Sequence, residues 1–312
     1  MGVEILQAAA LPPAINEQLL RDYTVHALWQ AEDRAALLRE TAGRVRGLVT
    51  SGSVGADRAL IEALPKLEII SSFGVGYDPI DIACAKERGV IVTNTPDVLT
   101  DDVADIAMAL LLDMMRRMPQ GDAFVRAGRW PKERFPLTDK LGGKTMGILG
   151  LGRIGQAIAR RAEPFGVAIA YHGPRRKPDI AWHYYDDLIA MAKAVDILMV
   201  ACPGGKATEG LVNAAVIAAL GPKGYLVNIA RGSVVEEPAL VEALVQGRLA
   251  GAGLDVFADE PNVPEALFAL DNVALAPHVG SATHATRRAM GELVLNNLAA
   301  HFAGKPVLTR VV

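Results

Sequence analysis

The segment Gly150-Leu-Gly152-Arg-Ile-Gly155 lies between a short apolar run at residues 145–149 and a predicted helix at residues 156–164. Glycines at this spacing suit a tight strand-to-helix turn. The first allows the turn, the second leaves room beside the backbone, and the third lets helix and strand pack closely. Such a turn belongs to a βαβ unit, so the sequence favours an α/β fold with a parallel sheet.

Short β-rich runs alternate with helical patterns on both sides of this turn. The first series of expected strands covers residues 3–7, 45–50, 67–72 and 90–93, with helices at 33–41, 56–64 and 80–88. The second series covers residues 145–149, 167–171, 197–201, 225–229, 251–255 and 273–275. A length of 312 residues favours two domains at roughly 150 residues each. We therefore expect an α/β protein with two Rossmann-like, doubly wound parallel-sheet domains.

Composition excludes several classes of protein. Hydrophobic residues make up 51% of the chain, enough for a substantial core, and the formal net charge of −3 disfavours a nucleic-acid partner. Cys84 and Cys202 are far apart in sequence, which disfavours a disulfide framework or a metal site and favours a reducing compartment. The N-terminus lacks the pattern of a secretory signal, and the apolar run at 103–115 is too short to cross a bilayer. A cytoplasmic chain without a membrane partner is expected.

Residues 101–115 form one long predicted helix with few polar positions, which should be buried between domains or subunits. Residues 118–143 are rich in Gly, Pro and charge, and include Trp130 and Phe135. A stretch this long without clear periodicity is either a disordered linker or an arm that packs on a partner subunit. The two aromatic side chains favour the arm, because exposing them to water is costly.

The glycine turn also predicts a cofactor, because the N-terminus of the following helix presents N–H groups and partial positive charge to a pyrophosphate. A ligand-free tight turn is the alternative. An NAD-selective site would place Asp or Glu after the next strand, where this chain has His172-Gly-Pro-Arg175-Arg176-Lys177. Cations and a planar guanidinium suit a 2′-phosphate, so we expect NADP(H) to be preferred, with NAD(H) weaker. Arg175 is favoured over Arg176 as the main contact, and a merely solvated basic turn is the alternative.

Three further segments each place a polar side chain after a predicted strand. They are Asn228-Ile-Ala-Arg231-Gly232, residues 253–261 with Glu260, and residues 276–283 with His278. Ligands of open α/β sheets bind beyond the carboxyl ends of strands, so these segments can meet. Arginine can hold a carboxylate, histidine can protonate an alkoxide, and a carboxylate can keep that histidine protonated. Together they predict hydride chemistry on a 2-oxo acid, although each alone could be an ordinary surface, turn or loop residue.

On these motifs the sequence resembles the D-isomer-specific 2-hydroxyacid dehydrogenase family over nearly its whole length. The segments that carry the resemblance are GLGRIGQAIARR at 150–161, CPGG…T…GL at 202–212, NIARGSVVEEPAL at 228–240, GAGLDVFADEP at 251–261 and APHVGSAT at 276–283. Within the family it is most similar to NADPH-dependent glyoxylate/hydroxypyruvate reductases, through GRWPKERFPLTDKLGGK and the basic turn. It departs from the usual pattern at Gly204-Gly205, where Thr is usual, and at Glu236, where Asp is common.

The resemblance implies that Arg231 binds substrate, His278 is the acid/base and Glu260 pairs with His278. The backbone of Val75 and Gly76 would bind the substrate carboxylate. Together with the glycine and basic turns, it implies cofactor contacts from Gly150, Gly152, Arg153, Ile154, Gly155, Arg175, Arg176, Lys177, Cys202, Pro203, Thr208, Ile229, Ala230, Asp255 and Gly280. Asp255 would hold the nicotinamide carboxamide. No metal is expected.

The resemblance also implies a discontinuous arrangement of domains. Residues 1–99 and 286–312 would form a flavodoxin-like substrate-binding domain, and residues 100–285 the dinucleotide-binding Rossmann domain. The active site would lie in the cleft between them, with hinges near residues 99 and 286. Residues 101–143 would form a homodimer interface, and Trp130 is a candidate to reach the partner's active site.

The expected substrates are small 2-oxo acids, glyoxylate or hydroxypyruvate, reduced to 2-hydroxy acids. The nearest alternative is a phenylpyruvate- or hydroxyphenylpyruvate-type reductase with a wider pocket. The basic turn disfavours phosphoglycerate dehydrogenase, and Glu260 disfavours formate dehydrogenase, which has an amide at that position. A non-catalytic dinucleotide sensor is a different class of alternative, opposed by the complete set of Arg231, Glu260 and His278.

Overall fold

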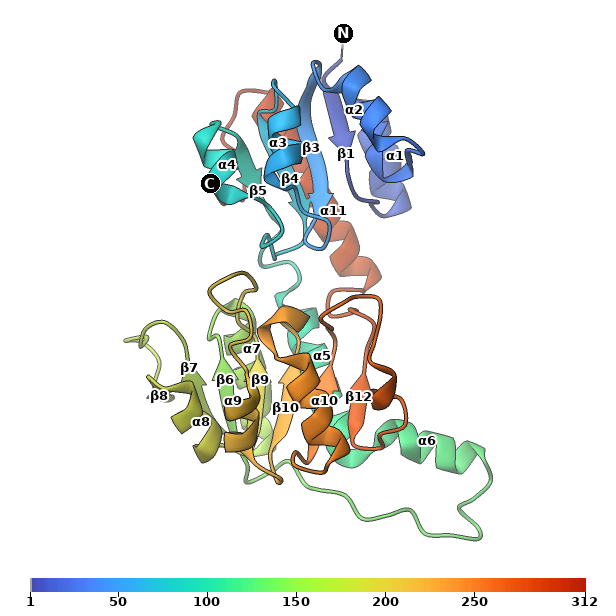
Figure 1. Ribbon diagram of the computed structural model, residues 1–312, viewed down its shortest axis with the longest axis vertical. Coiled ribbons are helices and arrows are strands. Elements are labelled where there is room, and N and C mark those ends of the chain that lie inside the picture. The colour runs from blue at the N-terminus through green and yellow to red at the C-terminus, as the bar shows by residue number, and fades with distance from the viewer. Residues whose placement is uncertain (1) are drawn as a thin grey trace. The chain divides into compact units, whose positions relative to one another are not determined.

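The computed structural model describes residues 2–312 of the chain. They form two compact units (Figure 1), which we call unit 1 (up to Leu99, with Ser281–Val312) and unit 2 (Thr100–Gly280). The chain returns from unit 2 to unit 1 at residue 281, whereas the sequence predicts this boundary at residue 286. Each unit has its own parallel sheet, so the predicted fold class is confirmed.

Unit 1 has a five-stranded parallel sheet in the order β2-β1-β3-β4-β5, the flavodoxin-like order. Its strands are β1 (Glu4–Gln7), β2 (Thr24–Ala27), β3 (Val45–Ser51), β4 (Ile69–Phe73) and β5 (Ile91–Thr93). Its helices are α1 (Pro13–Asp22), α2 (Arg34–Thr41), α3 (Arg58–Ala63), α4 (Ile82–Glu87) and α11 (His284–Phe302), with a 3-10 turn η1 (Leu28–Gln30).

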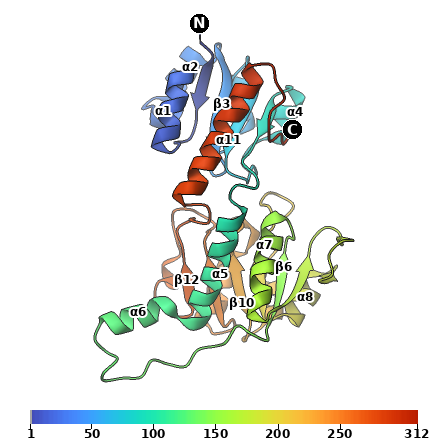
Figure 2. The same cartoon turned by 180° about the vertical axis from the view of Figure 1, so that it is seen from behind.

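Helices cover both faces of this sheet. On one face α2, α3 and α4 each begin at an aspartate, Asp33, Asp57 and Asp81, whose side chain accepts a backbone N–H of the first turn. Helices α1 and α11 lie on the other face (Figure 2). Gly291 of α11 packs so closely on Ile15 of α1 that a side chain there would overlap it.

Unit 2 has a seven-stranded parallel sheet in the order β12-β11-β10-β9-β6-β7-β8, which is the Rossmann order with one added strand. Its strands are β6 (Thr145–Leu149), β7 (Ala168–His172), β8 (His183–Tyr185), β9 (Ile197–Val200), β10 (Tyr225–Asn228), β11 (Gly251–Leu254) and β12 (Val273–Leu275). Its helices are α5 (Thr100–Arg116), α6 (Met118–Arg126), α7 (Arg153–Ala162), α8 (Leu188–Ala194), α9 (Ala214–Leu220) and α10 (Glu237–Val245). Short 3-10 turns are η2 (Glu163–Phe165), η3 (Gly232–Val234) and η4 (Glu265–Leu267).

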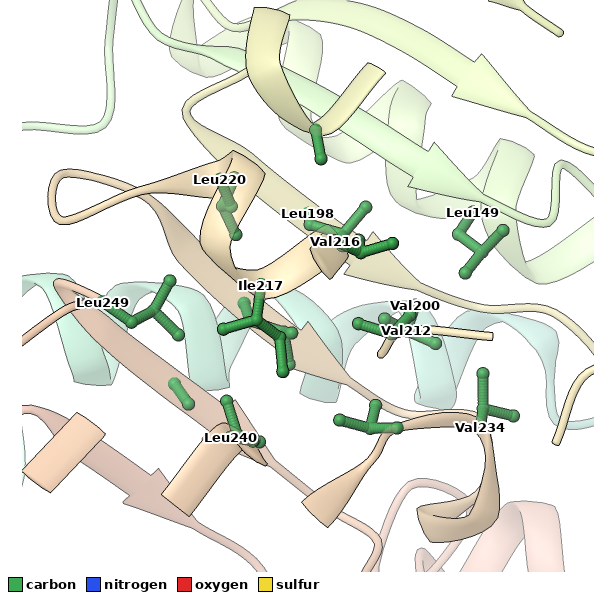
Figure 3. Packing of buried hydrophobic residues seen from close by; sticks show 14 of the residues in the cluster. Leu149, Leu198, Val200, Val212, Val216, Ile217, Leu220, Val234, Leu240 and Leu249 are labelled. Atoms are coloured by element: carbon green, nitrogen blue, oxygen red, sulfur yellow. The ribbon is translucent and has the colours of Figure 1, made fainter. Parts of the chain in front are cut away.

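The core of unit 2 lies on both sides of its sheet. Figure 3 shows Val216 and Ile217 of α9 and Leu240 of α10 in one buried cluster with the strand residues Leu198 and Val200. On the opposite face α5 packs on β11 and α7. The glycines of β11 allow this approach, since a Cβ at Gly253 would lie 3.0 Å from Leu110. The helix expected at 101–115 is thus present and buried along one face.

The sequence patterns do not indicate the strands β2 and β8 or the helix α6. The edge strands β2 and β8 are short and half-exposed, so neither has the apolar run of a central strand. Helix α6 begins with Pro119 in its first turn and contains Gly121, which hides its periodicity. After it, residues 127–144 form a long loop.

No helix within residues 2–312 combines the length and apolar character needed to cross a membrane.

Candidate active site

The glycine turn follows β6 and begins α7, where the strand order of unit 2 reverses between β6 and β9. Gly150 has φ +95°, and a Cβ there would lie 2.5 Å from Cα of Cys202. A Cβ at Gly155 would overlap the carbonyl oxygen of Gly150. Gly152 is the N-cap of α7, and a Cβ there would meet no atom within 4 Å. Two glycines therefore permit packing, while the middle one leaves open space at the helix N-terminus that fits a pyrophosphate.

The loop after β9 borders this turn. Cys202 is buried beside Gly150, and burial raises the pKa of its thiol to about 11. The Thr208 hydroxyl donates to the carbonyl oxygen of Pro203 at 2.7 Å, which closes the loop on itself. Ile229 is buried after the neighbouring strand, and the other predicted contacts nearby are Arg153 and Ile154 in the first turn of α7 and buried Ala230.

The basic turn follows β7, and no carboxylate stands at the end of that strand. His172 ends it, with Nδ1 2.9 Å from the carbonyl oxygen of Tyr185. Arg175 and Arg176 are exposed, and Lys177 is half-buried. Beside the turn lies a surface pocket that is lined by Gln156, Arg175, Arg176, Lys177, Pro178, Asp179 and Ile180. The structure therefore brings the basic turn into one hollow with the first turn of α7, and one acidic residue shares that hollow.

The three predicted catalytic residues follow three adjacent strands of unit 2. Arg231 follows β10, Glu260 follows β11, and His278 follows β12. Nδ1 of His278 lies 2.6 Å from Oε2 of Glu260, and 37% and 30% of their side-chain surfaces are exposed. Oε1 of Glu260 accepts the N–H of Phe257 at 3.1 Å. The structure thus brings the histidine and the carboxylate into direct contact beyond the carboxyl ends of the strands.

Asp255 holds the loop that carries His278. Its carboxylate oxygens accept the N–H groups of Val279 at 2.7 Å and Gly280 at 2.9 Å, and its carbonyl oxygen accepts the N–H of His278 at 2.9 Å. His278 has φ +53°, a left-handed conformation that a non-glycine residue adopts only when its surroundings hold it. Burial raises the pKa of Asp255, and the two donated N–H groups oppose that rise. A carboxamide contact from Asp255 stays a prediction.

Asn228 holds the loop that carries Arg231. Its side-chain amide donates to the carbonyl oxygen of Arg231 at 2.9 Å and accepts the N–H of Ala230 at 3.0 Å. Gly232 packs so closely on the backbone of Phe257 that the loops after β10 and β11 touch. The supporting role of Asn228 is not among the roles predicted from the sequence, although a buried amide at the end of an apolar strand is a signal of such support.

Val75 and Gly76 lie in unit 1, in the loop after β4. Both are half-buried, and the carbonyl oxygen of Val75 accepts the side-chain amide of Asn94 at 2.9 Å. Their predicted joint action with Arg231 of unit 2 stays a prediction. Among residues 2–312 no three His, Cys, Asp or Glu side chains are grouped to hold a metal ion.

The Rossmann strand order of unit 2 and its glycine turn define a dinucleotide-binding α/β protein. Residues 108–280 match the family model of the D-isomer specific 2-hydroxyacid dehydrogenase, NAD binding domain. The chain therefore belongs to the D-isomer-specific 2-hydroxyacid dehydrogenases, a family of oxidoreductases that bind a nicotinamide dinucleotide.

Relatives and solved structures agree with this assignment over the full chain. The chain is 48% identical to glyoxylate/hydroxypyruvate reductase A of Arabidopsis thaliana, covering 100% of this chain and 99% of the relative. It is 50% identical to hydroxyphenylpyruvate reductase of Plectranthus scutellarioides, with the same coverage. The structure is similar, with a TM-score of 0.92 and 46% identity, to the NADPH-dependent glyoxylate/hydroxypyruvate reductase of Sinorhizobium meliloti in complex with NADP and malonate. That match covers 100% of this chain and 97% of the other.

Proposed function

We propose that the protein reduces the small 2-oxo acids glyoxylate and hydroxypyruvate to 2-hydroxy acids with NADPH. The observation that carries this proposal is the 2.6 Å contact between His278 and Glu260, placed beside Arg231 at three adjacent strand ends. A proton donor, its charge partner and a cation for a carboxylate are the groups that reduction of a 2-oxo acid requires. The names of the relatives in Arabidopsis and Sinorhizobium support the same substrates.

Each residue has one task in the proposed reaction. A reduced nicotinamide, bound along the glycine turn, would supply a hydride to C2 of the oxo acid. The guanidinium of Arg231, with backbone N–H groups of Val75 and Gly76, binds the carboxylate and polarises the carbonyl. His278 donates its proton to the C2 oxygen, and Glu260 accepts a hydrogen bond from Nδ1 and orients the ring. Units 1 and 2 would thus serve as substrate-binding and dinucleotide-binding domains.

The preference for NADPH over NADH rests on the basic turn. No carboxylate follows β7 to bind a ribose 2′-hydroxyl, and Arg175, Arg176 and Lys177 share a pocket with the start of α7. A guanidinium there suits a 2′-phosphate through paired, charge-assisted hydrogen bonds. Replacing Arg175 by Ala should therefore raise KM for NADPH far more than KM for NADH. Equal effects on both cofactors would indicate that the turn is a solvated loop with no role in cofactor preference.

A homodimer in the cytoplasm completes the proposal. Trp130 and Leu137, in the loop after α6, are 69% and 99% exposed, and Phe268 is 65% exposed at a pocket lined by α5 and η4. Exposed apolar groups of this size favour a protein interface. Phe135, by contrast, packs on Phe124 of α6 within the same chain, with ring centroids 5.4 Å apart. Light scattering on the purified chain should give twice the monomer mass.

A wider pocket for phenylpyruvate or hydroxyphenylpyruvate is the second candidate, and the 50% identical relative from Plectranthus favours it. Comparing kcat/KM for glyoxylate, hydroxypyruvate and hydroxyphenylpyruvate, each with NADPH and NADH, decides between the two. Faster turnover of the two small acids with NADPH supports the first candidate. Preference for the aromatic acid keeps the mechanism and changes the substrate. Binding of NADPH without turnover of any acid would instead indicate a dinucleotide sensor.

A further inference from the structure

Two tyrosine hydroxyls hold the two ends of the basic turn. The hydroxyl of Tyr184 donates to the carbonyl oxygen of Gly173 at 3.0 Å, where the chain leaves β7. The backbone N–H of Lys177 donates to the hydroxyl of Tyr171 at 2.9 Å, where the turn ends. The residues between these two points, Pro174 to Arg176, are exposed. The backbone of the turn is therefore held at both ends by hydrogen bonds to tyrosines of the sheet.

The two tyrosines lie on neighbouring strands and pack on each other. Tyr171 of β7 and Tyr184 of β8 are paired across the parallel strands, and their ring centroids lie 5.2 Å apart with planes inclined by 51°. Tyr171 is 1% exposed, so its ring cannot swing away from the sheet. A third bond, from the His172 ring to the carbonyl oxygen of Tyr185 at 2.9 Å, ties β8 to the end of β7. The packing of the two rings therefore fixes the positions of their hydroxyl groups.

The cations that the turn presents are available to an anion. Within residues 2–312, the side chains of Arg175 and Arg176 form no ion pair. They line the pocket shared with Gln156 of α7. A flexible turn would have to be ordered when a phosphate binds, at the expense of affinity, whereas a turn already held in place loses less entropy.

We propose that Tyr171 and Tyr184 act as a clasp that holds the basic turn in position for a 2′-phosphate, and are thereby specificity-determining positioning residues for NADPH over NADH. The inference rests on the proposed cofactor preference and adds residues that would not themselves touch the phosphate. Because NADH has no 2′-phosphate, a looser turn should weaken NADPH binding and leave NADH binding nearly unchanged. A merely structural role would weaken both.

The test uses Tyr171→Phe, Tyr184→Phe and the double variant, which remove only the hydroxyls. Each single change should raise KM for NADPH about fivefold, the usual net effect of one hydrogen bond, with kcat and KM for NADH within about twofold of the unmodified protein. Tyr185→Phe is the matched control, since it removes a hydroxyl from the same strand that forms no bond to the turn. Titration calorimetry with adenosine 2′,5′-bisphosphate and with 5′-AMP gives the same comparison without turnover: only the bisphosphate should lose affinity.

The outcomes separate the clasp from the cofactor preference itself. If replacing both Arg175 and Arg176 by Ala leaves the ratio of NADPH to NADH KM values unchanged, the assignment of the 2′-phosphate site to the basic turn is wrong. If that ratio changes with the arginines but not with either tyrosine, the clasp is wrong. Equal losses for NADPH and NADH in the Phe variants would also overturn it. Tyr184 is half-buried, so Tyr184→Phe remains informative even if Tyr171→Phe lowers stability.

Discussion

The Nδ1 atom of His278 lies 2.6 Å from Oε2 of Glu260, on loops that follow neighbouring strands of one parallel sheet. The other carboxylate oxygen accepts the N–H of Phe257, so the glutamate is held from its own loop as well. A carboxylate in this position accepts a hydrogen bond from Nδ1 and fixes the orientation of the ring. Nε2 is thereby left as the nitrogen that can deliver a proton.

Replacing Glu260 by Gln should lower kcat for 2-oxo acid reduction about tenfold. The amide can still accept a hydrogen bond from Nδ1 of His278, but it no longer supplies a charge-assisted bond to the ring. The rate of NADPH oxidation with saturating glyoxylate measures the effect. Because Gln can still accept the N–H of Phe257, the loop should keep its shape. An unchanged kcat would count against the pair.

Two glycines of the same turn should respond to alanine in opposite ways. At Gly155 a methyl group would overlap the carbonyl oxygen of Gly150, so Gly155→Ala should lower the free energy of unfolding by about 2 kcal/mol. At Gly152 a methyl group meets open space, so Gly152→Ala should keep the thermal midpoint but weaken NADPH binding about tenfold by occupying the pyrophosphate space. Thermal unfolding and cofactor fluorescence titration measure the two effects. Tight NADPH binding by Gly152→Ala would exclude the assigned pyrophosphate site.

The thiol of Cys202 should be slow to alkylate. Burial raises its pKa to about 11 from an ordinary 9.0, so at pH 8 its thiolate fraction is about 100-fold smaller than that of an ordinary cysteine. The reaction rate with iodoacetamide should rise with pH up to that value. Mass spectrometry of the Cys202 peptide from folded and denatured protein gives the comparison. Prompt labelling of the folded chain at pH 8 would contradict the buried placement beside Gly150.

The alternation of apolar runs predicts most strands of both sheets because central parallel strands are buried on both faces. Runs such as Ile197–Val200 are apolar at every position, as expected of such strands. The edge strand Thr24–Ala27 has one neighbour and half-exposed side chains, so its sequence carries little of that signal. Helix α6 is hard to predict for a different reason. Pro119 and Gly121 usually interrupt helices, but proline is well tolerated in the first turn, where it stands here.

The candidate site was predictable where the backbone itself imposes the residue type. Gly150 and Gly155 are required by steric contact, and the pattern of glycines indicates both. The support beneath the site was not predictable, because it depends on which side chains meet after folding. Asp255 fixes the backbone of Val279 and Gly280, 24 and 25 residues further along, and no periodicity signals that meeting. The tyrosine pair beneath the basic turn belongs to the same class of long-range contact.

The most direct test of the account is the turnover of His278→Asn with glyoxylate and NADPH, measured beside its affinity for NADPH. If His278 is the proton donor, kcat falls by at least about 100-fold while the dissociation constant of NADPH stays within about twofold of the unmodified protein. A variant that retains near-normal kcat would contradict the assignment of His278 as the acid, and with it the mechanism built on the strand ends of unit 2.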